Sequence, residues 1–173
     1  MLTLSYTNED DRAYGLAGMA ISLAALDAID RISDISLDAR GPMVSFSHEY
    51  YFCGSPSISP KATWNNLLNN FYITSSMIVS NLLARSMVRL GEDVPQGLLD
   101  SIREEMLKEG HDTCSLEDDE IERLYLRSLT GMRRIFGNRR LYPAIEQFAR
   151  TLARRRTLTG TEIIDELRGL NLI

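Results

Sequence analysis

Two glycines, Gly15 and Gly18, lie inside an apolar helical pattern near the start of this chain. The pattern begins at Asn8 or Thr7, either of which can cap a helix, and apolar residues recur as far as Ala28. Each glycine costs about 1 kcal/mol relative to alanine inside a helix. The close approach of another backbone explains that cost best. The pattern therefore predicts a largely buried helix with a second element packed closely against it.

The remaining patterns predict more helices and a small sheet. Ile35 and Leu37, and then the residues from Val44 to Phe52, alternate with polar residues and predict two antiparallel strands. A long helical pattern follows, with one apolar side made of Trp64, Leu67, Leu68, Phe71, Ile78, Leu82 and Leu90. The next two predicted helices run from Pro95 to Gly110 and from a capping box of Ser115 and Asp118 to about Gly137. The last two run from Arg139 to Arg156 and, as a short helix, from a capping box of Thr159 and Glu162. The predicted fold class is mainly α with a small antiparallel β-sheet near the N-terminus (α+β).

Length and composition are those of a single globular domain. The chain has 173 residues, of which 44% are hydrophobic and 25% charged. The longest nearly apolar run, Tyr14 to Leu26, is too short to span a membrane. The first twelve residues are polar and acidic, unlike a secretory signal, and only two cysteines occur. We therefore expect a cytoplasmic protein without membrane insertion.

Charge is unevenly distributed along the chain. The net charge is −5, yet residues 120–160 hold ten arginines and three acidic residues, so this segment is +7 and the remainder −12. A stripe of Arg150, Arg154, Arg155 and Arg156 has the charge to bind phosphates. No helix-turn-helix, aromatic RNA platform or zinc knuckle accompanies it, so we expect no nucleic-acid partner. We interpret the arginines as solvated, or as paired within the fold and between subunits.

Residues 13–20 read Ala-Tyr-Gly-Leu-Ala-Gly-Met-Ala, which is the frame of the zinc-protease helix motif H-E-x-G-H. Four further stretches, in the same order, resemble one family of such enzymes: Ile35 to Gly41, Leu83 to Met87, Ser115 to Met132 and Arg156 to Ile163. Over roughly residues 11–169 the chain thus resembles the peptidase domain of the FtsH family of ATP-dependent zinc metalloproteases.

This resemblance implies an FtsH-peptidase-like helical domain. Family members carry a membrane anchor and an ATPase module before the peptidase, and neither pattern occurs in residues 1–173. Their peptidase domains assemble as hexamers. The resemblance therefore implies a homo-oligomer, or association with FtsH-type proteases, as possible forms of assembly.

The chemically active positions of the motif are occupied by inert residues. Gly15 and Met19 stand where two histidines would bind zinc, and Leu16 stands where the general-base glutamate would be. A catalytic zinc needs three protein ligands and an open position, so family-type catalysis is not expected. The third, acidic ligand position corresponds to either Asp118 or Glu120, and the two alignments remain open.

A replacement metal site is one alternative. His48, Cys53, His111 and Cys114 together offer the N₂S₂ donors of a structural zinc site, and a residual or altered zinc-dependent peptidase would use them or the acidic cluster. The simpler interpretation is that His48 shares a strand face with Phe46 and Tyr50 and that no cofactor is bound.

The favoured function is binding without catalysis. Zinc proteases of this type hold substrate as an added strand along a sheet edge, and that geometry does not require the metal. The sequence thus predicts a metallopeptidase-like pseudoenzyme, a peptide- or protein-binding or regulatory module, with Val44, Phe46, His48 and Tyr50 as the peptide-binding edge. A third hypothesis is an assembly subunit for active relatives.

Overall fold

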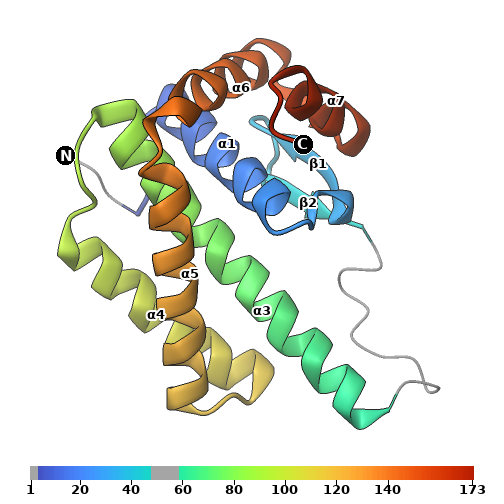
Figure 1. Cartoon of the computed structure of the whole chain (residues 1–173), viewed down its shortest axis with the longest axis vertical. Helices are drawn as coiled ribbons and strands as arrows, with labels where there is room; N and C mark the ends of the chain where they lie inside the picture. Colours follow the sequence, from blue (N-terminus) through green and yellow to red (C-terminus); the bar gives the residue numbers. More distant parts are fainter. Residues whose placement is uncertain (1–3, 48–58) are drawn as a thin grey trace.

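The computed structural model describes residues 4–47 and 59–173, and these residues are mostly helical (Figure 1). In chain order the elements are α1 (Glu9–Ala25), the 3-10 turn η1 (Ile29–Arg31), β1 (Ile32–Ser36), β2 (Val44–Phe46), α3 (Pro60–Leu83), the π-helix η2 (Ala84–Leu90), α4 (Gln96–Cys114), α5 (Asp118–Phe136), the 3-10 turn η3 (Arg139–Leu141), α6 (Tyr142–Arg155), β3 (Thr157–Thr159) and α7 (Gly160–Gly169). Three antiparallel strands form the described sheet, which confirms the α+β class.

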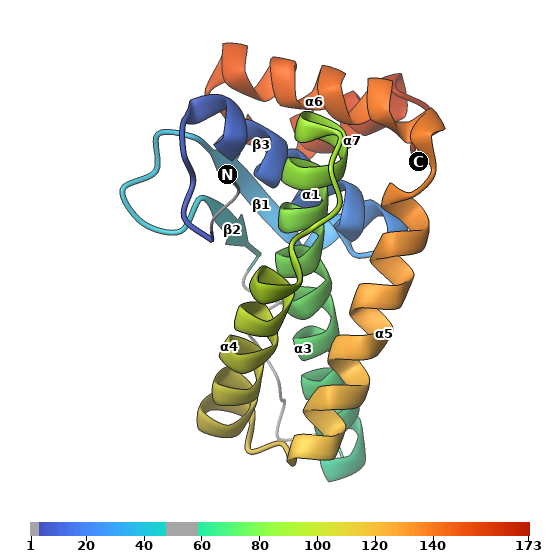
Figure 2. The ribbon, with the colours of Figure 1, turned by 90° about the vertical axis from the view of Figure 1, so that its left-hand side faces the viewer.

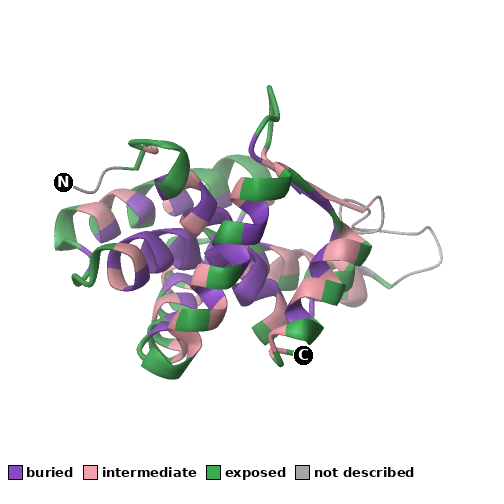
Figure 3. Cartoon of the chain, turned by 90° about the horizontal axis from the view of Figure 1, so that it is seen from above, coloured by how far each residue is buried: buried purple, intermediate pink, exposed green. Residues whose placement is uncertain are grey.

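Helix α1 lies at the centre of the fold. It contacts α3, α6 and η2 (Figure 2), and most of its length is buried. Figure 3 shows buried residues gathered in the middle of the molecule. Asn8 caps the helix, because its side-chain oxygen accepts the Asp11 backbone N–H at 2.8 Å. A Cβ added to Gly18 would lie 2.4 Å from the backbone carbonyl oxygen of Ser80 on α3. The close backbone approach predicted from the glycines is therefore confirmed.

The sheet has the order β2-β1-β3, so β1 is its central strand. Strands β1 and β2 agree with the predicted pair in type and direction, while residues 48–52 lie outside the described part of the chain. Strand β3 was not predicted. It arrives after α6, pairs Leu158 with Ile35, and is extended by a hydrogen bond from Leu37 N–H to the Arg156 carbonyl at 2.8 Å. The sheet thus joins the two ends of the chain.

Helices α3, α4 and α5 pack together below α1 (Figure 2). The predicted single apolar face of the long helix was wrong in part, because Trp64, Ile78 and Leu90 are 39%, 38% and 40% exposed. Different neighbours cover α3 at different points along its length, and its last turns become the π-helix η2, whose wider turns change which side chains share a face. Within the described ranges, no helix combines the length and apolar character needed to cross a membrane.

Two predicted boundaries around α4 and α5 were also wrong. Gly110 lies inside α4, because a Cβ there would approach Ile121 of α5 to 2.6 Å; the glycine serves helix packing and does not end the helix. Ser115 ends α4 in a left-handed conformation with φ of 52°. The capping box that begins α5 is formed by Glu117 and Glu120.

Candidate functional site

The three altered motif positions lie on α1, facing the core and α3. Leu16 is 1% exposed and packs in the hydrophobic core. A Cβ on Gly15 would lie 2.6 Å from Asn81 Nδ2 and 2.9 Å from Tyr6 Cε1. Asn81 Nδ2 donates to the Tyr6 hydroxyl at 2.7 Å and lies 3.7 Å from Met19 Sδ. An amide and a phenol thus fill the space that a side chain at position 15 would enter.

A buried ion pair lies one turn before the motif on α1. Arg85, 1% exposed, donates from Nε to Asp11 Oδ1 at 2.8 Å and from Nη2 to Asp11 Oδ2 at 2.7 Å. The same guanidinium donates to the backbone carbonyls of Leu4 at 3.3 Å and Ser5 at 3.0 Å. It also lies 4.8 Å from the ring centroid of Tyr6, at cation–π distance. Arg85 therefore joins η2 to α1 and holds residues 4–6 against both.

Two opposing effects determine the pKa of Asp11. Burial raises the pKa, but hydrogen bonds from the Arg85 guanidinium and from the Thr7 backbone and hydroxyl favour the carboxylate more strongly. The net result lowers the pKa from an ordinary 3.8 to about 2. For Tyr6, burial outweighs the Asn81 hydrogen bond and the nearby cations, and the pKa of the phenol is raised.

We expect acid to remove about 2 kcal/mol of stability through Asp11. Because its folded pKa lies below its unfolded pKa, the contribution is complete above the unfolded value and is lost as pH falls towards 2. Urea unfolding between pH 5 and 2 should show a shallower loss for Asp11→Asn than for the natural protein. Glu9, Asp38 and Glu162, whose pKa values are also lowered, titrate in both proteins. Parallel pH profiles would contradict this assignment.

An apolar pocket of about 260 Å³ lies between α1, β2 and α3. Leu16 and Met19 line it from the motif helix, Val44 and Phe46 from β2, and Met77 from α3. The altered motif therefore lies beside the strand for which the resemblance to zinc proteases implied peptide binding.

The backbone N–H and C=O groups of Val44 on β2 are directed away from β1. Ser36 N–H donates to the Met43 carbonyl at 2.8 Å, and Ile35 is the partner of Val44. In an antiparallel ladder this makes Ile35–Val44 a non-hydrogen-bonded pair, so the N–H and C=O of Val44 point away from β1. β2 is the last strand on this side of the described sheet. The structure thus places Val44 and Phe46 in an edge strand, whereas His48 and Tyr50 lie outside the described residues.

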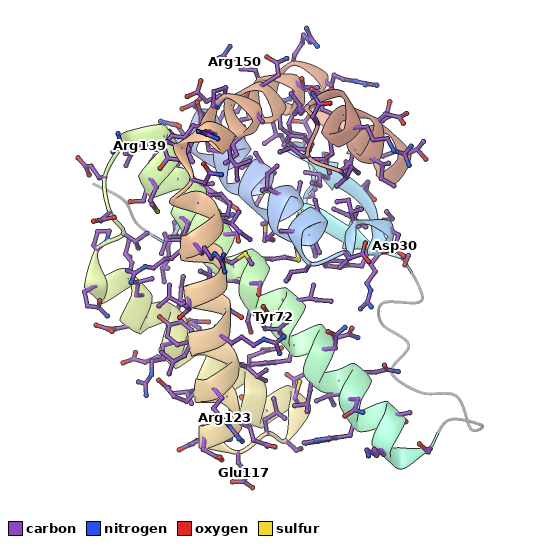
Figure 4. The ribbon with its side chains drawn as sticks, viewed as in Figure 1. Asp30, Tyr72, Glu117, Arg123, Arg139 and Arg150 are labelled. Carbon is purple, nitrogen blue, oxygen red and sulfur yellow. The ribbon has the colours of Figure 1, made fainter. Side chains whose placement is uncertain are left out.

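The candidate acidic ligands are not near the motif. Asp118 and Glu120 begin α5, at the end of that helix that lies away from α1, as the position of Glu117 in Figure 4 shows. Asp118 Oδ1 lies 2.5 Å from His111 Nε2, and Glu120 accepts the Glu117 backbone N–H at 3.1 Å. Both carboxylates therefore act at the turn between α4 and α5.

The alternative metal set is divided between described and undescribed residues. His111 and Cys114 lie near the end of α4, and His48 and Cys53 lie outside the described ranges. In residues 4–47 and 59–173, no three His, Cys, Asp or Glu side chains gather as metal ligands would. The four-residue set therefore stays a prediction, which the zinc content of the purified protein would test.

Most of the arginine stripe is paired within the fold. Arg150 pairs with Glu146 at 3.0 Å, Arg155 pairs with Glu162, and Arg156 contacts both Glu9 and Asp38. The predicted internal pairing is confirmed for these three arginines. Figure 4 shows Arg150 on α6, with Arg139 at the corner between α5 and α6.

Sequence reasoning missed Tyr6 and Asn81 as neighbours of the motif. Neither residue has a local pattern that signals the contact, because 75 positions separate them. Arg85 did have a signal, since it is the one charged residue in the mostly apolar segment 82–88.

Comparisons with protein-family models, curated proteins and solved structures give no match for this chain. The resemblance to FtsH peptidase domains therefore remains an expectation from the motifs alone.

Proposed function

We propose that this chain binds a protein partner by adding an extended segment of it to the outer side of β2, and that it does so without catalysis. The observation that supports this proposal is the pocket between Leu16 and Met19 on α1 and Val44 on β2. A strand added beside β2 would take main-chain hydrogen bonds from Val44, and alternate side chains would face the pocket.

The pocket suits a single apolar side chain. Its volume of about 260 Å³ is below the range of roughly 300–1,000 Å³ that holds drug-sized ligands. Met19, Met43 and Met77 line it, and methionine side chains adapt readily to different apolar shapes. A partner segment with leucine, isoleucine, methionine or phenylalanine at one position would therefore fit.

The residues at the motif support binding over hydrolysis. Glycine at position 15 offers no donor atom, Leu16 is a core residue, and the Met19 thioether is a soft, weak ligand. Asn81 and Tyr6 occupy the adjacent space. The partner in this proposal is an FtsH-type protease or a further copy of the chain. That choice of partner rests on the resemblance alone.

We expect extended octapeptides with one central leucine in a Thr/Val background to bind, as measured by fluorescence anisotropy. A scan that N-methylates one peptide residue at a time should abolish binding at every second position. Only the N–H groups at those positions face β2. Met43→Glu should weaken binding by about tenfold or more, since it places a charge at the apolar pocket.

Met87→Glu is the matched control, because Met87 is also half-buried but lies on η2. It should leave peptide affinity unchanged. The proposal fails if no extended peptide binds, or if N-methylation weakens binding equally at every position.

A further inference from the structure

A second and larger apolar cavity, of about 890 Å³, lies between α3 and α4. Leu67, Phe71 and Ile78 line it from α3 at helical spacing, and Ile102 and Met106 line it from α4. The lining residues of each helix extend over about 17 Å, or three turns, at 1.5 Å per residue. We call this cavity the α3–α4 groove. It meets the pocket beside β2 at Ile78, which lines both.

Within the part of the chain that the structure describes, α3, α4 and α5 leave one position of a helix bundle open. Helix α5 packs against both α3 and α4, and none of its described residues lines the groove. Facing stripes on two neighbouring helices, with a third helix already packed on the pair, are the arrangement of a four-helix bundle with three positions filled. The shape that fits the remaining position is another helix, which would bury an apolar face against both stripes.

The charge of the groove specifies the flanks of such a helix. Its charged lining residues are Glu105 and Glu109, on successive turns of α4 and both exposed, and no lysine, arginine or histidine is among the described residues that line it. The surrounding segment 96–122 holds ten acidic residues and two basic ones, and one of those two, Arg103, is paired with Glu122 at 2.6 Å. A complementary partner therefore carries lysine or arginine beside its apolar face.

We propose that the α3–α4 groove binds the apolar face of a basic amphipathic helix from a partner protein. Apolar side chains at positions i, i+4, i+7 and i+11 contact Leu67 and Ile78 and cover the more deeply buried Phe71, and flanking cations contact Glu105 and Glu109. This site goes beyond the proposed strand addition at β2 and does not depend on it.

Two synthetic 14-residue helices test the proposal. Both carry the same leucine face; one has lysine flanks and the other glutamate flanks. Trp64 is the only tryptophan in the chain, lies one turn before Leu67 on α3 and is 39% exposed, so its emission reports binding without a label. The lysine peptide should shift that emission and bind about tenfold more tightly than the glutamate peptide.

Variants on α4 separate local charge complementarity from general attraction. Glu105→Lys with Glu109→Lys should reverse the preference between the two peptides. Glu104→Lys with Asp112→Lys changes the charge of the same helix equally at exposed positions outside the groove, and should keep the preference. Leu67→Asp should weaken both peptides. The proposal is overturned if neither peptide binds, which is the result expected when other residues of this chain fill the groove. It is also overturned if both peptides bind with the same affinity, or if the two charge variants show the same preference.

Discussion

Arg85→Leu is expected to lower the free energy of unfolding by about 3 kcal/mol or more, because it leaves the Asp11 carboxylate buried without its bidentate partner. Arg89 Nη1 still donates to Asp11 Oδ1 at 2.9 Å, which keeps the loss near the lower end of the range for broken buried pairs. The carbonyls of residues 4 and 5 lose their donor as well. Urea or thermal unfolding at pH 7 measures the change.

Two controls identify the cause of that loss. Arg150→Leu removes an arginine from an exposed i,i+4 pair with Glu146 and should cost about 0.5 kcal/mol or less. The double variant Arg85→Leu with Asp11→Leu should be more stable than Arg85→Leu alone, because the buried carboxylate that has lost its bidentate partner is then removed. If Arg85→Leu costs no more than Arg150→Leu, the buried pair does not have the structural role assigned to it.

Gly18→Val is expected to cost about 3 kcal/mol, at the upper end for overpacked cores. The first added carbon would lie 2.4 Å from the Ser80 carbonyl oxygen and 2.7 Å from Ala84 Cβ. The nearest of these is backbone, so α1 and α3 must separate to admit it. Thermal unfolding measures the loss, and hydrogen exchange should show weaker protection in both helices.

Gly97→Ala is the matched helix glycine without a neighbour. It lies in the first turn of α4, and a Cβ there would meet nothing within 4 Å. Alanine should stabilise the protein there by roughly 0.5–1 kcal/mol, because it restricts the unfolded chain and favours the helix. Equal losses for Gly18→Val and Gly97→Ala would contradict close packing of α1 on α3.

Local hydrogen bonding explains which helix boundaries the sequence predicted well. Asn8 caps α1, and Thr159 with Glu162 caps α7, because each bond joins groups only three residues apart. Ser115 was misassigned because a serine can end one helix as well as begin the next, and the direction in which the chain leaves α4 decides between them. Gly110 was misassigned because its reason lies in Ile121, on another helix.

The candidate site shows the same division. Alternation placed Val44 and Phe46 in a strand, and the structure confirms this. The packing of α1, α3 and the sheet places this strand beside the altered motif. Met77 of α3 completes the pocket between them. The structure also separates Asp118 and Glu120 from that motif, which spacing along the chain did not indicate.

The sequence by itself determined the α+β class, the buried glycine-bearing helix and the absence of nitrogen or oxygen donors from the side chains at positions 15, 16 and 19, because periodicity, capping and side-chain chemistry are local properties. Only the tertiary structure decided that Arg85 pairs with Asp11, that β3 joins the sheet and that the α3–α4 groove exists. Those contacts join residues about 75 to 120 positions apart or depend on whole helices packing, and no local pattern encodes which distant surfaces meet.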